Sequence, residues 1–140
     1  MDKKTLVAGL QAVIRKHASE NRTFVLVMLI PTEPSAIDNK FTLVISAPWL
    51  DAKSPKEAVN SILSSLIDQL DSTDSPEYQK IARVTVIKSS DPFVRTITSA
   101  FTVSNGDLTI QNCNVNGVLI ERATLLESHR LTNPTGLLQC

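Results

Sequence analysis

The chain has 140 residues with a hydrophobic fraction of 42%, which predicts one globular domain with a core of its own. Its 14 Lys and Arg residues balance 14 Asp and Glu residues. This balance argues against nucleic acid as the main partner, because phosphate contacts favour a basic excess.

Cysteine content and hydropathy bear on the compartment. The two cysteines, Cys113 and Cys140, could form a disulfide, but so low a count favours a reduced protein. The N-terminal segment lacks the continuous apolar core of a signal peptide. No apolar run approaches the ~20 residues of a membrane span. We therefore expect a cytoplasmic protein with no membrane partner.

The first half of the chain predicts a helix and two strands. Residues 3–18 carry an apolar stripe at helical spacing, which predicts an amphipathic helix. Residues 23–30 are apolar on both faces, as in a central strand. Residues 41–47 predict a second strand, paired with the first as a wide hairpin.

The clearest helix start lies in the middle of the chain. Ser54, Pro55 and Glu57 form a capping box with proline at the first helical position. An apolar stripe follows and predicts a helix lying across the sheet. Residues 81–88 predict a third strand.

The last third predicts a short helix and a three-stranded meander. Asp91-Pro92 is typical of a helix start, so we expect a helix over 92–98 and a strand over 99–104, with one long strand as the alternative. Asn105-Gly106 and Asn116-Gly117 are each typical of a tight hairpin turn. Residues 129–140 predict a surface tail.

Together these elements predict a single α+β domain over residues 1–128. The predicted order is α-β-β-α-β-α-β-β-β, with a mainly antiparallel sheet in a two-layer arrangement and helices on one face.

The predicted meander contains a conflict over which face is buried. A two-residue turn at Asn116-Gly117 pairs Val115 with Val118 and Cys113 with Ile120. With strand alternation, the apolar side then changes near Asn112. Three explanations remain open: a β-bulge that shifts the register, a bend that packs the back of the tip on another element, or a projecting tip that binds a partner.

A partner surface is the first functional hypothesis. An exposed tip would present Val115, Val118 and Ile120, and the one tryptophan, Trp49, could act as an interaction anchor. We therefore expect a non-catalytic protein–protein interaction or regulatory module that binds a protein partner or self-associates as a homo-oligomer.

Catalysis is the alternative hypothesis. Asn112, Asn114, Glu121 and Arg122 predict a polar cluster on the hairpin. Asp91 and Glu121, with Lys88, are similar to the acidic pairs of metal-dependent nucleases, so a small hydrolase or nuclease-like enzyme is the second reading, although Asp91 is better explained as a helix cap. Cys113 is better explained as a buried apolar residue than as a nucleophile. The sequence lacks zinc-ligand spacing and a glycine-rich phosphate loop, so no metal or cofactor is expected.

Overall fold

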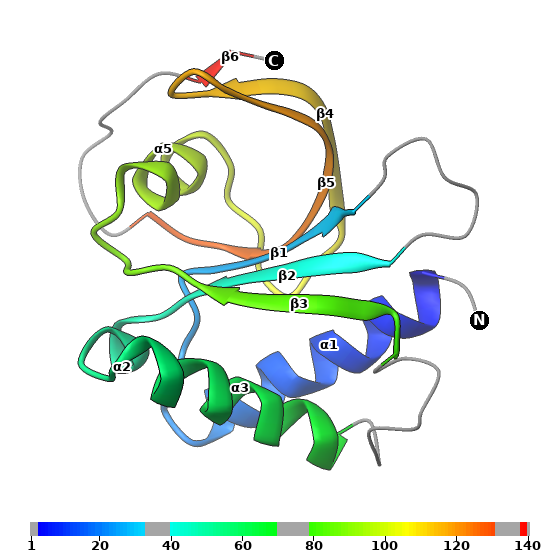
Figure 1. Cartoon of the computed structure of the whole chain (residues 1–140), viewed down its shortest axis with the longest axis vertical. Helices are drawn as coiled ribbons and strands as arrows, with labels where there is room; N and C mark the ends of the chain where they lie inside the picture. The colour runs from blue at the N-terminus through cyan, green and yellow to red at the C-terminus, as the bar shows by residue number, and fades with distance from the viewer. Residues whose placement is uncertain (1–2, 33–39, 70–78, 131–137, 140) are drawn as a thin grey trace.

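A twisted sheet forms the centre of the molecule (Figure 1). The computed structural model describes residues 3–32, 40–69, 79–130 and 138–139. Over these residues the sheet has six strands in the order β3-β2-β1-β5-β4-β6. Only β2 and β3 pair in parallel, which confirms the predicted α+β class with a mainly antiparallel sheet. The strands are β1 (Leu26–Pro31), β2 (Phe41–Ser46), β3 (Ile81–Val86), β4 (Leu108–Val115), β5 (Val118–Ser128) and β6 (Leu138–Gln139).

Helices lie on both faces of this sheet. Helices α1 (Lys3–Ser19) and α3 (Pro55–Gln69) cover one face, and α5 (Pro92–Ala100) lies on the other (Figure 1). The expectation that all helices share one face therefore applies to α1 and α3 only. A short helix that was not predicted, α2 (Pro48–Asp51), precedes α3.

The face under α1 and α3 follows the sequence pattern closely. Ser54 caps α3 as predicted, since its hydroxyl accepts a hydrogen bond from the Glu57 N–H at 3.3 Å, and the Glu57 carboxylate accepts from that hydroxyl at 3.1 Å and not from the Ser54 N–H of a full capping box. Ala58, Ile62 and Leu66 of α3 are buried against the sheet. Strand β1 lies between β2 and β5, as expected for a strand that is apolar on both faces.

Helix α5 replaces the strand predicted at residues 99–104. It continues to Ala100, and Val103 then forms only an isolated bridge with Ser128. Val94 and Ile97 are fully buried against the sheet, and this packing outweighs the strand preference of the neighbouring threonines. The predicted meander is therefore wrong at its first turn.

Strands β4 and β5 form the hairpin that Asn116-Gly117 predicts. Val115 pairs with Val118 and Cys113 with Ile120, which is the predicted register. Asn116 and Gly117 have φ angles of 52° and 89°, as a primed hairpin turn requires.

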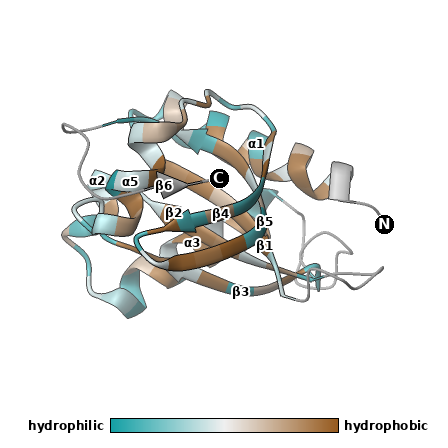
Figure 2. Cartoon of the chain, turned by 90° about the horizontal axis from the view of Figure 1, so that it is seen from above, coloured by the Kyte–Doolittle hydropathy of each residue, from teal (hydrophilic) through white to brown (hydrophobic). Residues whose placement is uncertain are grey.

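A bend at Asn112 resolves the conflict between the two faces of the hairpin. Asn112 has a φ of 53°, and the register is the same on both sides of it. The buried residues step by three at this point, from Ile110 to Cys113 in β4 and from Ile120 to Ala123 in β5. The hairpin therefore curls over α5 (Figure 1), and its hydrophobic and hydrophilic stretches alternate along the ribbon (Figure 2). Of the three explanations that the sequence left open, the structure has the bend, and it has no register shift between β4 and β5.

Candidate functional site

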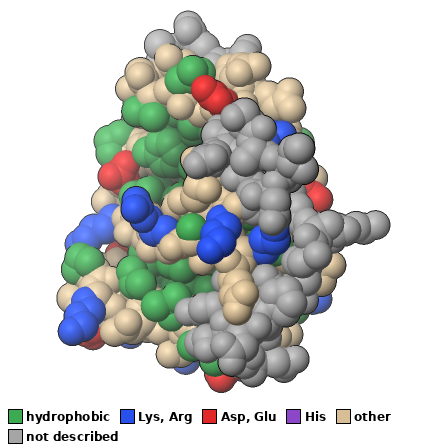
Figure 3. Space-filling view, turned by 45° about the vertical axis from the view of Figure 1, so that its right-hand side comes forward, with side chains coloured by type: hydrophobic (Ala, Val, Ile, Leu, Met, Phe, Trp, Pro, Cys, Tyr) green, Lys and Arg blue, Asp and Glu red, His purple; other side chains and the backbone are tan. Residues whose placement is uncertain are grey.

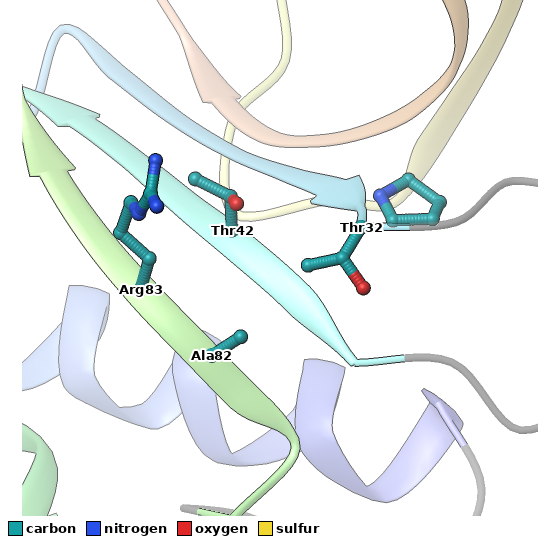
Figure 4. Close-up of a pocket in the computed structure, with 5 residues that line it drawn as sticks. Thr32, Thr42, Ala82 and Arg83 are labelled. Carbon is teal, nitrogen blue, oxygen red and sulfur yellow. The ribbon is translucent and has the colours of Figure 1, made fainter.

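A pocket opens on the part of the sheet face that α5 does not cover. Its volume is about 370 Å3, and it lies where β1 ends and where β2 and β3 begin (Figure 4). Leu26, Met28 and Val44 on the same face belong to the core under α5. The pocket is lined by Pro31, Thr32, Thr42, Ala82 and Arg83.

An irregularity in β3 places Arg83 in this pocket. Phe41 pairs with Ile81, but the next residue, Thr42, pairs with Arg83, so Ala82 is an additional residue in β3. Such bulges redirect side chains and are common beside functional sites. Ile81 packs against the core under α1 and α3. Arg83 and Thr42 rise from the opposite face, away from α1 and α3 (Figure 4).

The pocket contains an unpaired charge. The guanidinium of Arg83 forms no hydrogen bond or ion pair with any residue in the described part of the chain, and neither does the hydroxyl of Thr42. The Thr32 hydroxyl donates to the Lys40 carbonyl at 3.2 Å, which leaves its oxygen able to accept. On this side of the molecule, Lys and Arg side chains form a row between two groups of hydrophobic side chains (Figure 3).

Sequence reasoning missed this site. It treated Thr42 and Arg83 only as strand residues. Two features of the sequence could have indicated it. One face of β2 changes from apolar Val44 to polar Thr42, and Arg83 lies in a strand that is otherwise largely apolar. The bulge at Ala82 and the parallel pairing with β2 were needed to bring them together.

Trp49 lies at the edge of the core, packed in an aromatic cluster. Its ring stacks on His17, with centroids 5.1 Å apart, and contacts Phe24 edge-on at 5.7 Å. Its indole N–H donates to the Thr23 carbonyl at 3.1 Å, and the Arg22 guanidinium lies 5.7 Å from the ring centroid. Its role as a partner anchor stays a prediction.

His17 is the buried member of this cluster. Its Nε2 lies 2.7 Å from the Ser65 hydroxyl, which itself donates to the Ser61 carbonyl at 3.1 Å, so Nε2 carries the proton in that bond. Nδ1 is buried with no hydrogen-bond partner among the described residues. Burial, and then the nearby charge of Arg22, lower the pKa of His17. His17 is therefore a neutral core residue at pH 7.

The hairpin tip exposes a smaller apolar surface than the sequence predicted. Val115 and Ile120 are buried, so they do not form one exposed patch with Val118. Their burial follows from the bend at Asn112, which turns them toward the core under α5. The exposed apolar residues at the tip are Val118 (57% exposed) and Leu119 (60%).

The predicted polar cluster lies largely in solvent. Asn112 and Glu121 are exposed, and Arg122 is half-buried. The Asn114 side-chain oxygen accepts a hydrogen bond from the Gly117 N–H at 2.8 Å, so Asn114 shapes the turn. Local structure therefore explains Asn112 and Asn114.

The predicted catalytic residues, all in the described part of the chain, form no side-chain hydrogen bond or ion pair with one another, although the Asp91 N–H donates to the Lys88 carbonyl at 3.0 Å. Asp91 caps α5, since its side chain accepts a hydrogen bond from the Phe93 N–H at 2.9 Å. Lys88 is exposed beyond the end of β3, and Glu121 is exposed on β5. Over residues 3–32, 40–69, 79–130 and 138–139, no group of three or more His, Cys, Asp or Glu side chains could hold a metal ion.

Cys113 is fully buried and disulfide-bonded, so it does not supply a free thiol nucleophile. This bond also departs from the expectation of a reduced protein. The other cysteine, Cys140, lies outside the described residues.

A second polar cluster, which the sequence did not predict, fastens the loop before β4. The buried Glu127 carboxylate accepts a hydrogen bond from the Asn105 N–H and lies 2.5 Å from Nε2 of His129. The Gln11 side chain of α1 donates to the Gly106 carbonyl at 2.9 Å. These bonds link the loop to β5 and α1, and we interpret the cluster as structural.

The fold and the pocket define a small α+β domain with one unpaired arginine in a surface hollow. In comparisons with known proteins, no family model, no curated protein and no solved structure matches this chain. No helix in the described part of the chain is long and apolar enough to cross a membrane.

Proposed function

We propose that this domain is a non-catalytic protein–protein interaction module and that the pocket around Arg83 is its contact surface. The observation that carries the proposal is the guanidinium of Arg83, which has no partner among the described residues and lines a hollow of about 370 Å3. An arginine in this setting is a frequent anchor at interfaces, because its planar fork can bind a partner group with several hydrogen bonds.

The exposed apolar residues of the hairpin tip support the same class of function. Val118 and Leu119 are the most exposed large hydrophobic residues in the described part of the chain. Two such residues are too few to define an interface, and a specific interface needs roughly 800 Å2 from each partner. Self-association through this tip stays a prediction.

An enzyme that uses Asp91 and Glu121 is the alternative, and no observation favours it. The Asp91 carboxylate already accepts a hydrogen bond from the first turn of α5. The proposed cytoplasmic location also remains a prediction, and the disulfide at Cys113 argues against it because such bonds are rare in a reducing cytosol.

The proposal is tested by charge reversal in the pocket. The wild-type domain, Arg83→Glu and Lys56→Glu would each be used as bait in the native cell extract, with captured proteins quantified by mass spectrometry. Lys56 is an exposed lysine of α3, on the other face of the sheet, so it controls for the change in net charge. We expect one or more partners to be retained by wild type and Lys56→Glu and lost with Arg83→Glu. Equal capture by all three proteins would refute the role of the pocket.

A further inference from the structure

We infer that the Arg83 pocket binds a single carboxylate group, presented by an Asp or Glu side chain of the partner protein. This inference rests on the proposed function, because it names the partner group that the interaction surface would recognise.

Charge is the first reason for a carboxylate. Among the described lining residues, Arg83 is the one with a formal charge, and other Lys and Arg side chains lie in a row on the same side of the molecule (Figure 3). The site therefore favours an anion. A carboxylate carries one charge and fits the guanidinium with two parallel hydrogen bonds.

Hydrogen-bonding capacity is the second reason. The Thr42 hydroxyl has no partner among the described residues and can donate to a carboxylate oxygen. The Thr32 hydroxyl already donates its proton to the Lys40 carbonyl. Its oxygen can therefore only accept, and Thr32 offers no hydrogen bond to the anion. The pocket thus presents the fork of Arg83 and one free hydroxyl, which matches the two oxygens of a carboxylate.

The size of the pocket is the third reason. A volume of about 370 Å3 is near the lower end of the range for ligand sites, roughly 300–1,000 Å3. It exceeds a carboxylate alone and has room for an acidic side chain with part of its backbone. Ala82 contributes to this space, because the bulge places a small side chain where β3 meets the pocket.

A titration of the isolated domain tests the inference without the partner. The N–H signal of the Arg83 side chain would be followed by NMR at constant ionic strength. The probes are N-acetyl-glutamate amide, the matching glutamine derivative and inorganic phosphate. We expect a saturable shift with the glutamate probe in the millimolar range and no saturation with the glutamine probe. No saturation with the glutamate probe, or tighter binding of phosphate, would overturn the inference.

Variants locate the binding. For Arg83→Gln we expect a loss of affinity of roughly tenfold or more, followed through backbone signals, because a charge-assisted pair is removed. Ala82→Leu keeps Arg83 but fills the hollow, so it should also weaken binding. Lys56→Gln should bind as wild type does. A dispersed spectrum establishes that each variant is folded. Unchanged affinity in both Arg83→Gln and Ala82→Leu would place the carboxylate elsewhere and refute the assignment.

The outcomes separate this inference from the proposed function. If the free domain binds the glutamate probe through Arg83 but captures no Arg83-dependent partner, the carboxylate site stands and the interaction function fails. If an Arg83-dependent partner is captured but the glutamate probe does not bind, the function stands and the carboxylate assignment fails.

Discussion

Two parts of one sheet face differ in what covers them. Near α5, the strands present Leu26, Met28 and Val44, which are buried in the core beneath that helix and the curled hairpin. Toward the other end of the same strands, Thr42 is half-buried and Arg83 is exposed. Strand β2 thus changes from an apolar to a polar surface along this face, from Val44 to Thr42, and Arg83 of β3 lies beside Thr42. The covered part stabilises the fold, and the uncovered part is open to solvent.

A substitution in the covered part of the face should cause the largest loss of stability. Ile97 of α5 is fully buried between the helix and the sheet. For Ile97→Ala we expect the free energy of unfolding to fall by about 2–5 kcal/mol, because a cavity forms in a packed core. Urea unfolding followed by circular dichroism would measure it.

The matched control is Val118→Ala, which removes methyl groups from a side chain that is 57% exposed. We expect this control to change stability by less than about 0.5 kcal/mol. A similar small effect for Ile97→Ala would show that α5 is not a tightly packed cover and would remove the contrast between the two parts of the face.

A substitution at the bend of the hairpin, at Asn112, should cause the next largest loss of stability. Asn112 has a φ of 53°, a conformation that costs a β-branched residue roughly 1–2 kcal/mol. For Asn112→Val we expect a loss of unfolding free energy of that size, whereas Asn112→Gly should be tolerated because glycine adopts this conformation readily. Thermal or urea unfolding of both variants measures the difference.

The neighbouring substitution Gln111→Val provides the control, since Gln111 is exposed and lacks a positive φ. Valine favours strands, so this control should be neutral or slightly stabilising. If Asn112→Val were also neutral, the hairpin would not depend on a left-handed residue for its curvature.

The hairpin illustrates what local sequence can and cannot predict. Asn116-Gly117 fixes its own turn, so the pairing of Val115 with Val118 followed from the sequence. At Asn105-Gly106 the same dipeptide does not make a hairpin, because the preceding segment is held as a helix by the burial of Val94 and Ile97. Local turn preference is weaker than core packing when the two conflict.

The candidate site depended even more on long-range structure. Thr42 and Arg83 are far apart in the chain and meet through a parallel pairing that no short motif predicts. At Val115 and Ile120 the sequence predicts an exposed apolar patch, but the bend at Asn112 buries both side chains. Strand alternation assigns faces reliably only while the backbone remains regular.

The cap of α5 should have a smaller effect than its core. The Asp91 side chain accepts a hydrogen bond from the Phe93 N–H. For Asp91→Ala we expect a loss of about 1 kcal/mol in the free energy of unfolding, and Asp91→Ser should restore most of it because serine also caps helices. Chemical denaturation of both variants would test this. If serine does not restore stability, Asp91 stabilises the domain through more than its hydrogen bond to the Phe93 N–H.

The uncovered part should show the smallest effect on stability. Arg83 is exposed and has no partner among the described residues, so Arg83→Gln removes no internal hydrogen bond of the described part of the chain. We expect a change of less than about 0.5 kcal/mol in the free energy of unfolding, as for other exposed sites. Denaturation of Arg83→Gln beside Ile97→Ala measures the contrast directly. A loss as large as that of Ile97→Ala would mean that Arg83 supports the fold, since a residue kept free for a ligand should contribute little to the stability of the empty domain.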